Sequence, residues 1–390
     1  MNYHIDVFHH SLNKYGEELC GDHIEIASYE DGKIIVLSDG LGSGVKANIL
    51  ATLTAKIAVT MLKENSTIED TLDTITKTLP ICQVRKMAYS TFTIIKAENS
   101  GLVKIIEFDN PSYFYFSHRN LMMPEKKTRI IHGKTILESS FIMGVDDYLM
   151  VISDGVVHAG VGELLNFGWT SKEIGEFLKN LPKEVKASPL LTNEVLSYTD
   201  VLYNGKPGDD ATVLSLTMKK KKSLHLFTGP PGKKEDDPVL IQAYEAAEGL
   251  KVISGGTTAN IISNGIGQTI KIDLSQKNEL LPPMGAMEGA TLVTEGVLTL
   301  AQVISILEDF QDPNKSIEVL MRMTKVDGAT RLCQLILEEA TEVIIWMGTA
   351  VNPAHQEPGF SYHYHYKVGQ IEKLRNIISD FGKEVILYTL

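Results

Sequence analysis

The sequence has few cysteines and no long run of apolar residues. Its three cysteines, Cys20, Cys82 and Cys333, are widely spaced and odd in number, so a disulfide framework is not expected and a reducing compartment suits the chain. No segment approaches the roughly 20 uninterrupted apolar residues of a membrane-spanning helix. Residues 1–10 also lack the basic and apolar regions of a secretory signal. These absences predict a soluble, cytoplasmic protein with no membrane partner.

Positive charge is also in short supply. The 37 Lys and Arg residues are outnumbered by 49 Asp and Glu residues, which leaves a formal net charge of -12. Nucleic acids and anionic membrane surfaces both require a basic binding surface, so neither is expected as the main partner. Part of the negative charge would be neutralised if clustered carboxylates hold metal ions.

The length of 390 residues exceeds what one hydrophobic core usually serves, which favours two domains. Four consecutive lysines, residues 219–222, stand between two strand-like runs and indicate a solvated hinge. We therefore predict one domain over residues 1–220 and another over residues 221–390.

The first part is rich in strands, and its helices come in pairs rather than alternating with the strands. Helices are expected at residues 43–64, 67–79, 171–180 and 190–202. Strands are expected at residues 33–38, 90–97, 103–108, 112–117, 128–132, 148–153 and 211–218. This order predicts an α+β fold, a two-sheet antiparallel β-sandwich flanked by helices.

The second part alternates strands and helices more regularly. Strands are expected at residues 224–228, 251–254, 291–294, 342–347 and 384–390, and helices at residues 238–247, 300–310, 329–339 and 369–381. Alternation of this kind predicts an α/β domain with a largely parallel sheet.

Four short acidic motifs lie beside strand-like runs: Cys20-Gly21-Asp22, Ser38-Asp39-Gly40, Ser153-Asp154-Gly155 and Gly208-Asp209-Asp210. Singly, each is an ordinary turn sequence, because Asp and Gly favour turns. Together they indicate a carboxylate cluster, and clustered carboxylates repel one another unless a cation binds them. Oxygen ligands favour Mg²⁺ or Mn²⁺ over Zn²⁺. The glycine after Asp39 would let a backbone carbonyl reach the same ion.

Such a site can hydrolyse a phosphate ester without a side-chain nucleophile. Two metal ions about 3.5 to 4 Å apart lower the pKa of a bridging water, aim it at phosphorus and stabilise the developing charge. The residues are therefore compatible with a binuclear hydrolase. Spacing alone does not show that the four motifs meet in space.

From about Tyr15 to Met218 the chain resembles the metal-dependent serine/threonine phosphatases of type 2C (PPM), in the bacterial branch typified by sporulation stage II protein E. Six motifs carry the resemblance, in the order of that family: Leu19-Cys20-Gly21-Asp22, Val36-Leu37-Ser38-Asp39-Gly40-Leu41-Gly42-Ser43-Gly44, Tyr89-Ser90-Thr91, Asn110-Pro111-Ser112-Tyr113, Met150-Val151-Ile152-Ser153-Asp154-Gly155 and Gly208-Asp209-Asp210-Ala211-Thr212-Val213. Each motif is weak alone, and the set is specific.

The resemblance implies roles for these residues. Asp39 would bridge two or more Mn²⁺ or Mg²⁺ ions, with Asp22 and the Gly40 carbonyl completing one site and Asp154 and Asp209 the other. Asp39, Asp154 and Asp209 would in this way carry catalysis. Asp210 would support a ligand or bind an additional ion.

The resemblance also implies a substrate, phosphoserine or phosphothreonine on a protein partner. In this branch the usual partner is a small anti-anti-sigma-like regulator, and a helical pair corresponding to residues 43–79 acts as a regulatory switch. The resemblance therefore implies that the second domain or a partner would bias this pair here. The alternative is a pseudophosphatase, or a sensor whose C-terminal domain binds a small ligand or regulator. The oligomeric state stays open, a dimer included.

Other segments leave alternatives open. Cys20 replaces the serine usual in the family and is either a small packed residue or a redox-sensitive thiol. Residues 229–234 indicate a proline-rich turn rather than a Walker motif. Residues 254–259 follow a strand and could offer backbone N–H groups to an anion. His363 and His365 would share one face of a strand, as ordinary strand residues or as a metal pair.

Overall fold

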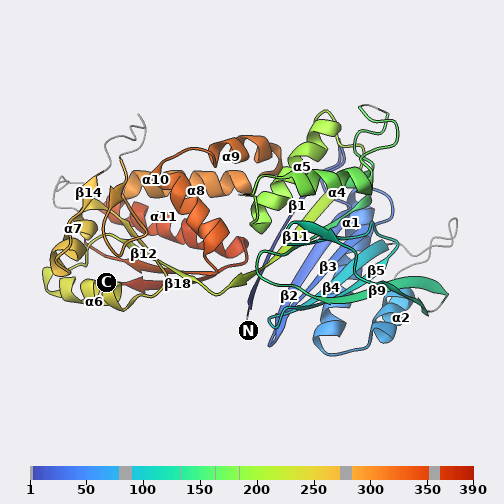
Figure 1. The fold of residues 1–390 in the computed structure, drawn as a ribbon, viewed down its shortest axis with the longest axis horizontal. Helices are drawn as coiled ribbons and strands as arrows, with labels where there is room; N and C mark the ends of the chain where they lie inside the picture. Colours follow the sequence, from blue (N-terminus) through green and yellow to red (C-terminus); the bar gives the residue numbers. More distant parts are fainter. Residues whose placement is uncertain are drawn as a thin grey trace. The chain divides into compact units, whose positions relative to one another are not determined.

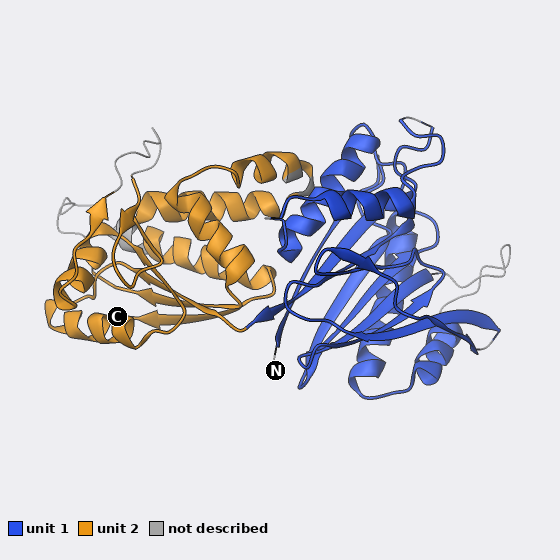
Figure 2. Cartoon of the chain, viewed as in Figure 1, with its two compact units in different colours: residues 1–220 blue, residues 221–390 orange. Residues whose placement is uncertain are grey.

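The computed structural model describes residues 3–78, 90–131, 133–162, 164–183, 185–272, 283–350 and 361–390 (Figure 1). Two compact units make up the chain, Met1–Lys220 and Lys221–Leu390 (Figure 2). Each unit has its own sheets and its own hydrophobic core.

The first unit contains eleven described strands and five described helices. The strands are β1 (Tyr3–Leu12), β2 (Asp22–Tyr29), β3 (Gly32–Gly40), β4 (Ser90–Glu98), β5 (Leu102–Phe108), β6 (Phe114–Ser117), β7 (Asn120–Met122), β8 (Lys127–Ile131), β9 (Lys134–Ile142), β10 (Tyr148–Ile152) and β11 (Ala211–Lys220). The helices are α1 (Gly44–Lys63), α2 (Ile68–Thr78), α3 (Asp154–Val157), α4 (Ser171–Asn180) and α5 (Ser188–Leu202).

These strands form two sheets, one in the order β1-β11-β10-β6-β7 and the other in the order β2-β3-β4-β5-β9-β8. Every pairing described within them is antiparallel. Strand β3 shows why its sequence is a continuous apolar run. Ile35 and Leu37 pack into the core between the sheets, whereas Ile34 and Val36 pack on the other face with α1 and α2. Both faces of β3 are buried, so apolar residues need not alternate with polar ones.

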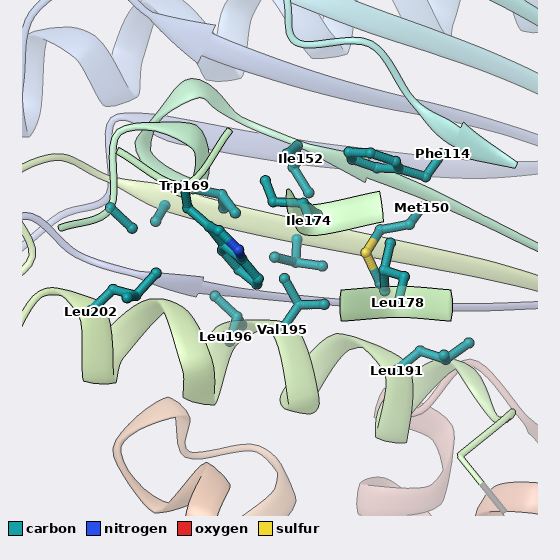
Figure 3. Close-up of a cluster of buried hydrophobic side chains, with 14 of the residues drawn as sticks. Phe114, Met150, Ile152, Trp169, Ile174, Leu178, Leu191, Val195, Leu196 and Leu202 are labelled. Atoms are coloured by element: carbon teal, nitrogen blue, oxygen red, sulfur yellow. The ribbon is translucent and has the colours of Figure 1, made fainter. Parts of the chain in front are cut away.

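Helices cover the outer face of the other sheet as well. Figure 3 shows Val195 and Leu196 of α5 and Ile174 and Leu178 of α4 converging with Met150 of β10 on one cluster of buried side chains. The unit therefore has four layers, helix, sheet, sheet and helix. This confirms the predicted α+β fold with antiparallel sheets and flanking helices.

The second unit carries a seven-stranded sheet in the order β14-β15-β16-β13-β12-β17-β18 among its described residues. Its strands are β12 (Ser223–Thr228), β13 (Leu250–Ser254), β14 (Lys271–Ile272), β15 (Gly285–Ala286), β16 (Leu292–Thr294), β17 (Glu342–Met347) and β18 (Glu384–Thr389). Its helices are α6 (Asp237–Ala246), α7 (Gly256–Gly265), α8 (Val297–Phe310), α9 (Ser316–Arg322), α10 (Gly328–Gln334) and α11 (Ser361–Asp380), with short helical segments η1 (Lys234–Asp236), η2 (Pro313–Lys315) and η3 (Leu335–Glu339).

Strands β16, β13, β12, β17 and β18 of this sheet run parallel to one another. On one face, Leu240 and Tyr244 of α6 and Ile262 of α7 pack against Phe227 and Ile253. The predicted α/β unit with a largely parallel sheet is thus present, and β14 and β15 add a short antiparallel edge.

Strand β1 was not expected, because its histidines and Asp6 interrupt the apolar pattern. In the fold β1 pairs along its whole length with β11, and Ile5 and Val7 face the core. Asp6 is buried and forms an ion pair of 2.8 Å with Lys219, whose side chain is 13% exposed. The interpretation of residue 219 as part of a solvated hinge is therefore wrong, since its charge is paired inside the first unit.

We expected the segment around His363 and His365 to be a strand. That prediction is wrong, because the segment lies in helix α11.

Helix α1 is long and apolar enough to cross a membrane by length and composition alone. Such a helix is weak evidence for a membrane span, because core helices of soluble proteins have the same composition. Ala47, Ala51 and Ala55 of α1 are completely buried, as expected of a helix lying on a sheet.

Candidate metal and phosphoryl-transfer site

The register between β2 and β3 places Asp22 directly opposite Asp39. Residues opposite each other in an antiparallel pair project to the same face of the sheet, so the two carboxylates are neighbours. At the same edge, the Gly40 N–H donates a 3.1 Å hydrogen bond to the Gly21 carbonyl. A Cβ on Gly40 would lie 2.1 Å from the Ala47 carbonyl oxygen, so only glycine permits α1 to approach this edge.

A second pair of strands brings the remaining motifs together. The Ser153 N–H donates to the Thr212 carbonyl at 3.0 Å, and the Thr212 N–H donates to Ser153 Oγ at 2.8 Å. This pairing fixes the end of β10 beside the start of β11. It places Asp154, the first residue of α3, beside Asp209.

Gly155, the glycine of the third motif, occupies a position with no room for a side chain. A Cβ on Gly155 would lie 2.1 Å from the Asp210 carbonyl oxygen, and the Gly155 carbonyl accepts a 2.6 Å hydrogen bond from the Tyr203 hydroxyl. The backbone of the third motif is therefore packed directly against the backbone of the fourth.

We predict that Gly155→Ala lowers the melting temperature by roughly 2–12 °C, because overpacking costs about 1–3 kcal/mol and a domain of this size loses about 2–4 °C per kcal/mol. Gly144→Ala is the matched control, since its nearest neighbour to the new Cβ would be 3.8 Å away. Thermal unfolding of both variants checks this. Equal melting temperatures would contradict the close packing of the two motifs.

The electrostatics show that the carboxylates of all four motifs influence one another. Burial and the nearby Asp22, Asp154 and Asp209 raise the pKa of Asp39 to about 9. Burial also raises the pKa of Asp22 to about 7, with Asp210 and Asp154 adding to the rise while the Thr212 and Ser153 hydroxyls oppose it. These residues come from four separate segments of the chain, and the fold brings them into one cluster.

Asp209 follows the same pattern. Burial and the neighbouring Asp154 raise its pKa, while the N–H of Asp210 and the charge of Lys14 lower it in part. Its Oδ1 accepts a 3.0 Å hydrogen bond from the Asp210 N–H. The pKa of Asp209 is raised overall, so these two contacts do not offset the effects of burial and of repulsion between the carboxylates.

Several oxygens of the cluster lack the partners that buried polar atoms normally have. Both Oδ atoms of Asp22 and Oδ2 of Asp210 are buried and make no hydrogen bond of normal geometry within the described residues, although the Thr212 and Ser153 hydroxyls lie close enough to Asp22 to lower its pKa in part. Asp210 Oδ1 accepts a 2.9 Å hydrogen bond from the Lys14 N–H. Buried carboxylate oxygens without normal hydrogen bonds suit a hard divalent cation, which prefers oxygen ligands and neutralises the repulsion. The donor set therefore fits Mg²⁺ or Mn²⁺.

His158 belongs to the same place and was not predicted. Single ligand atoms of Asp154, His158 and Asp209 all lie within 4.8 Å of one another, and His158 Nδ1 is 4.0 Å from Asp154 Oδ2. These three residues could hold a metal ion. The sequence signal was present, because His158 follows Asp154 by four residues and a helical turn brings such residues to one side.

Cys20 lies beside the cluster. Its backbone carbonyl accepts a 2.8 Å hydrogen bond from the Asn48 amide, and its thiol lies 4.0 Å from the Thr212 hydroxyl. Burial, reinforced by Asp22 and Asp210, raises the pKa of the thiol far above its usual range. Because the thiolate is the nucleophile, this favours the packed residue over the redox-sensitive thiol. Cys82 lies outside the described residues.

A cavity of about 480 Å³ opens beside Asp154 and His158. Its wall includes Asn110, whose amide donates to Thr93 Oγ1 at 2.9 Å and to the Ile152 carbonyl at 3.1 Å. These bonds attach the Asn110-Pro111 turn to the end of β10. The cavity is large enough for a side chain and its flanking backbone.

Residues 30–219 match the family model described as stage II sporulation protein E (SpoIIE). The N-terminal unit is similar to the SpoIIE family over these residues. The match is just under half of the chain and ends before the second unit. It begins after Asp22, so the position of that residue in the SpoIIE-type site rests on its register with Asp39. No curated protein matches the chain.

Solved structures with similar folds include the phosphatase domain of the cell fate determinant SpoIIE from Bacillus subtilis, at 17% identity and a TM-score of 0.44 over 56% of this chain and 94% of that one. Another is the RsbU and RsbW domains of Rv1364c from Mycobacterium tuberculosis, at 14% identity and a TM-score of 0.48 over 63% and 69%. A third is RsbX in complex with magnesium, at 17% identity and a TM-score of 0.41 over 56% and 98%.

The SpoIIE family match identifies the N-terminal unit as a PP2C-type serine/threonine phosphatase domain, as its motifs predicted. The same unit contains a cluster of acidic residues and a histidine that could hold a metal ion.

Proposed function

We propose that the N-terminal unit hydrolyses phosphoserine or phosphothreonine on a protein substrate, using two or more Mn²⁺ or Mg²⁺ ions. The observation that carries this proposal is the meeting of carboxylates from four chain segments around buried oxygens of Asp22 and Asp210 that make no hydrogen bond of normal geometry in the described part of the chain. A cluster with so much uncompensated charge is expensive to build for structure alone.

The residues divide into two groups in this proposal. Asp22, Asp39 and the Gly40 carbonyl would hold one ion, Asp154 and Asp209 would hold another, and Asp39 would lie between them. When bound, such ions lower the pKa of water and polarise the phosphoryl group. The chain's own part is to fix these oxygens at the ends of paired strands, where their positions vary little.

Asp210 has a supporting part. Its Oδ1 is held by the Lys14 N–H, whereas Oδ2 lies so near Gly21 that a Cβ there would be 2.8 Å away. This oxygen faces the Gly21-Asp22 turn, where it would orient the Asp22 side of the site or bind an additional ion.

The cavity beside Asp154 would receive the phosphorylated side chain. Asn110 and Pro111 form one part of its wall and His158 another. Asp109 and Asp154 make this wall acidic, whereas the charge of Glu107 is paired with Lys126, so a phosphate would be repelled unless cations are bound first. In this account the substrate is a phosphorylated regulator protein of the anti-anti-sigma type, the setting is the cytoplasm, and the C-terminal unit regulates turnover.

The experiment that tests this function is release of phosphate from a phosphoserine protein by the full chain, with Mn²⁺ and then with excess chelator. Turnover with Mn²⁺ and its loss on chelation are expected. Absence of turnover despite saturable Mn²⁺ binding would identify a pseudophosphatase instead. Activity that survives full chelation would contradict the proposed site.

The His158→Gln variant distinguishes two roles that this histidine could have in the site, metal ligand and proton donor. As a metal ligand, its loss would raise the Mn²⁺ concentration for half-maximal activity by about tenfold and leave kcat at saturating Mn²⁺ nearly unchanged. We expect this result, because the imidazole lies with Asp154 and Asp209. His118→Gln, an exposed histidine, is the control.

The contradicting result is a lower kcat at saturating Mn²⁺ for a phosphoserine substrate but not for an aryl phosphate. An aryl oxide leaves without protonation, so that pattern would make His158 a proton donor rather than a ligand.

A further inference from the structure

The strand order of the second unit creates a topological switch point. From β12 the chain continues outward through β13 to β16, then returns to the other side of β12 as β17 and β18. The connections after β12 and β17 therefore diverge at the carboxyl ends of two neighbouring parallel strands. In open parallel sheets, ligands bind in the crevice that such a divergence creates.

Backbone turns without side chains line this edge. A Cβ on Gly348, after β17, would lie 2.1 Å from the Pro230 carbonyl oxygen and 2.3 Å from that of Gly229, after β12. A Cβ on Gly296, after β16, would lie 3.4 Å from the Cα of Gly255, after β13. Gly229 and Gly255 also have φ values of +79° and +128°, which L side chains rarely adopt.

Helix α7 begins at this edge with uncapped N–H groups. Gly255 precedes it and makes no side-chain cap, and no acidic residue occupies its first turn. Gly256 and Thr257 are exposed, and no atom of the described residues lies within 4 Å of where a Cβ on Gly256 would be. The first N–H groups of a helix have no partner within it and attract anions. A helix start alone does not make a site.

The independent observation is Thr258, the third residue of α7. It is fully buried, and its hydroxyl has no hydrogen-bond partner in the described part of the chain. Other buried helical threonines in this protein donate to the carbonyl four residues earlier, as Thr54 does to Leu50 and Thr199 to Val195, both at 2.8 Å. Thr258 does not make that bond. Its Oγ1 instead lies 3.5 Å from where a Cβ on Gly255 would be, facing the glycine turn.

Thr294 contacts the same glycine through its backbone. Thr294, at the end of β16, is buried, and its Oγ1 has no partner among the described residues, although its carbonyl accepts a 2.9 Å hydrogen bond from the Gly255 N–H. Buried hydroxyls normally find a partner. The Thr294 side chain lies beside Gly328 at the start of α10, where a Cβ would be 2.8 Å from its Cγ2, so the Thr258 hydroxyl alone faces the glycine turn.

Lys367 brings a cation to the switch point. Its Nζ donates a 2.5 Å hydrogen bond to the Gly348 carbonyl and lies 1.8 Å from where a Cβ on Gly229 would be, so it fills the space beside that glycine. None of the described carboxylates forms an ion pair with it. Burial lowers the pKa of this lysine to about 8. An anion bound beside it would restore its charged form.

We propose that the switch point of the C-terminal unit binds the phosphate group of a small ligand, on the N–H groups of α7, the Thr258 hydroxyl and the Lys367 ammonium. The turns after β12 and β13 connect these groups, because a Cβ on Gly255 would lie only 3.9 Å from the Gly229 nitrogen. The phosphate is either free orthophosphate or part of a phosphorylated small molecule such as a nucleotide. The site does not depend on the activity proposed for the N-terminal unit.

The test is calorimetric titration of the full chain with orthophosphate, AMP and ADP, in chelator so that no metal ion recruits phosphate to the N-terminal unit. Saturable binding of at least one probe, with a dissociation constant of about 1 mM or lower, is expected. Tighter binding of a nucleotide than of orthophosphate identifies a phosphorylated small molecule as the ligand. Equal or tighter binding of orthophosphate identifies the free ion.

Two variants test whether Thr258 and Lys367 bind the phosphate. Thr258→Val removes the unpaired hydroxyl, so the ligand-free protein should unfold at an equal or higher temperature while the affinity for the bound probe falls about tenfold. Lys367→Met should weaken binding at least as much, and Lys373→Met, on the exposed side of α11, should leave it unchanged. The proposal is overturned if no probe binds at about 10 mM, or if binding survives both variants undiminished.

Discussion

Replacing Asp39 with asparagine should lower kcat/KM for Mn²⁺-dependent phosphate ester hydrolysis by about a thousandfold or more. Asp39 lies opposite Asp22 in the β2–β3 register and is close to Asp154 and Asp209, so it is the carboxylate common to both halves of the cluster. Losing it removes a ligand from both proposed ions. A thousandfold loss corresponds to about 4 kcal/mol of transition-state stabilisation, which is within what metal ions supply.

The measurement is the initial rate with an aryl phosphate and with a phosphoserine protein, at several Mn²⁺ concentrations. Asp31→Asn is the matched control, because Asp31 is exposed in the turn between the same two strands. An Asp39→Asn variant that folds normally and retains even a tenth of the wild-type rate at saturating Mn²⁺ would be incompatible with the proposed role.

The second large effect concerns stability rather than turnover. In chelator, Asp22→Asn should raise the melting temperature of the N-terminal unit by roughly 2–8 °C. Both Asp22 oxygens are buried and make no hydrogen bond of normal geometry in the described part of the chain, and the nearby hydroxyls do not offset the burial and repulsion that raise its pKa. Unsatisfied buried groups cost about 1–3 kcal/mol. Asparagine carries no charge and can donate to the neighbouring Asp210 carboxylate.

With Mn²⁺ bound, the order of stability should reverse, and the wild type should be more stable than the Asp22→Asn variant. At about 100 times its dissociation constant, Mn²⁺ should stabilise the wild type by about 2.7 kcal/mol and the Asp22→Asn variant far less. Scanning calorimetry with and without Mn²⁺ measures both effects, with Asp31→Asn again as the control. If the variant were less stable in chelator, Asp22 would be a structural residue whose partner matters more than its charge.

The sequence reveals those parts of the site that depend on local pattern. Strand β3 is a continuous apolar run ending at Asp39, so both the strand and the residue at its end were predicted. The pairing of Asp22 with Asp39 could also have been predicted from the sequence. The tight turn between Tyr29 and Gly32 sets the register, and counting back along both strands leads to these two aspartates. The hairpin was missed because β2 carries mixed residues.

Contacts between residues far apart along the chain could not be predicted from local sequence patterns. Asp154 meets Asp209 because β10 pairs with β11, and those strands are separated by three helices along the chain. No local signal defines that pairing. His158 was missed for a different reason, since its spacing from Asp154 was visible but its proximity to Asp209 was not.

The second unit shows the same division. Alternating patterns predicted a parallel sheet, and the segment at residues 254–259 was noted as a candidate for binding an anion. The side on which the chain returns to β12 depends on how the helices pack, so the switch point was not predictable. Lys367 and Thr258 are far apart along the chain and have no motif in common. Only the fold brings the turns beside them into contact.

The most direct test of the proposed site is a crystal of the full chain soaked in Mn²⁺, with the ions located by anomalous scattering. We predict at least two Mn²⁺ peaks, one coordinated by Asp22 and Asp39 and another by Asp154 and Asp209, with Asp39 contacting both. Under soaking conditions that support turnover in solution, an absence of Mn²⁺ peaks within coordinating distance of Asp39 would contradict the account.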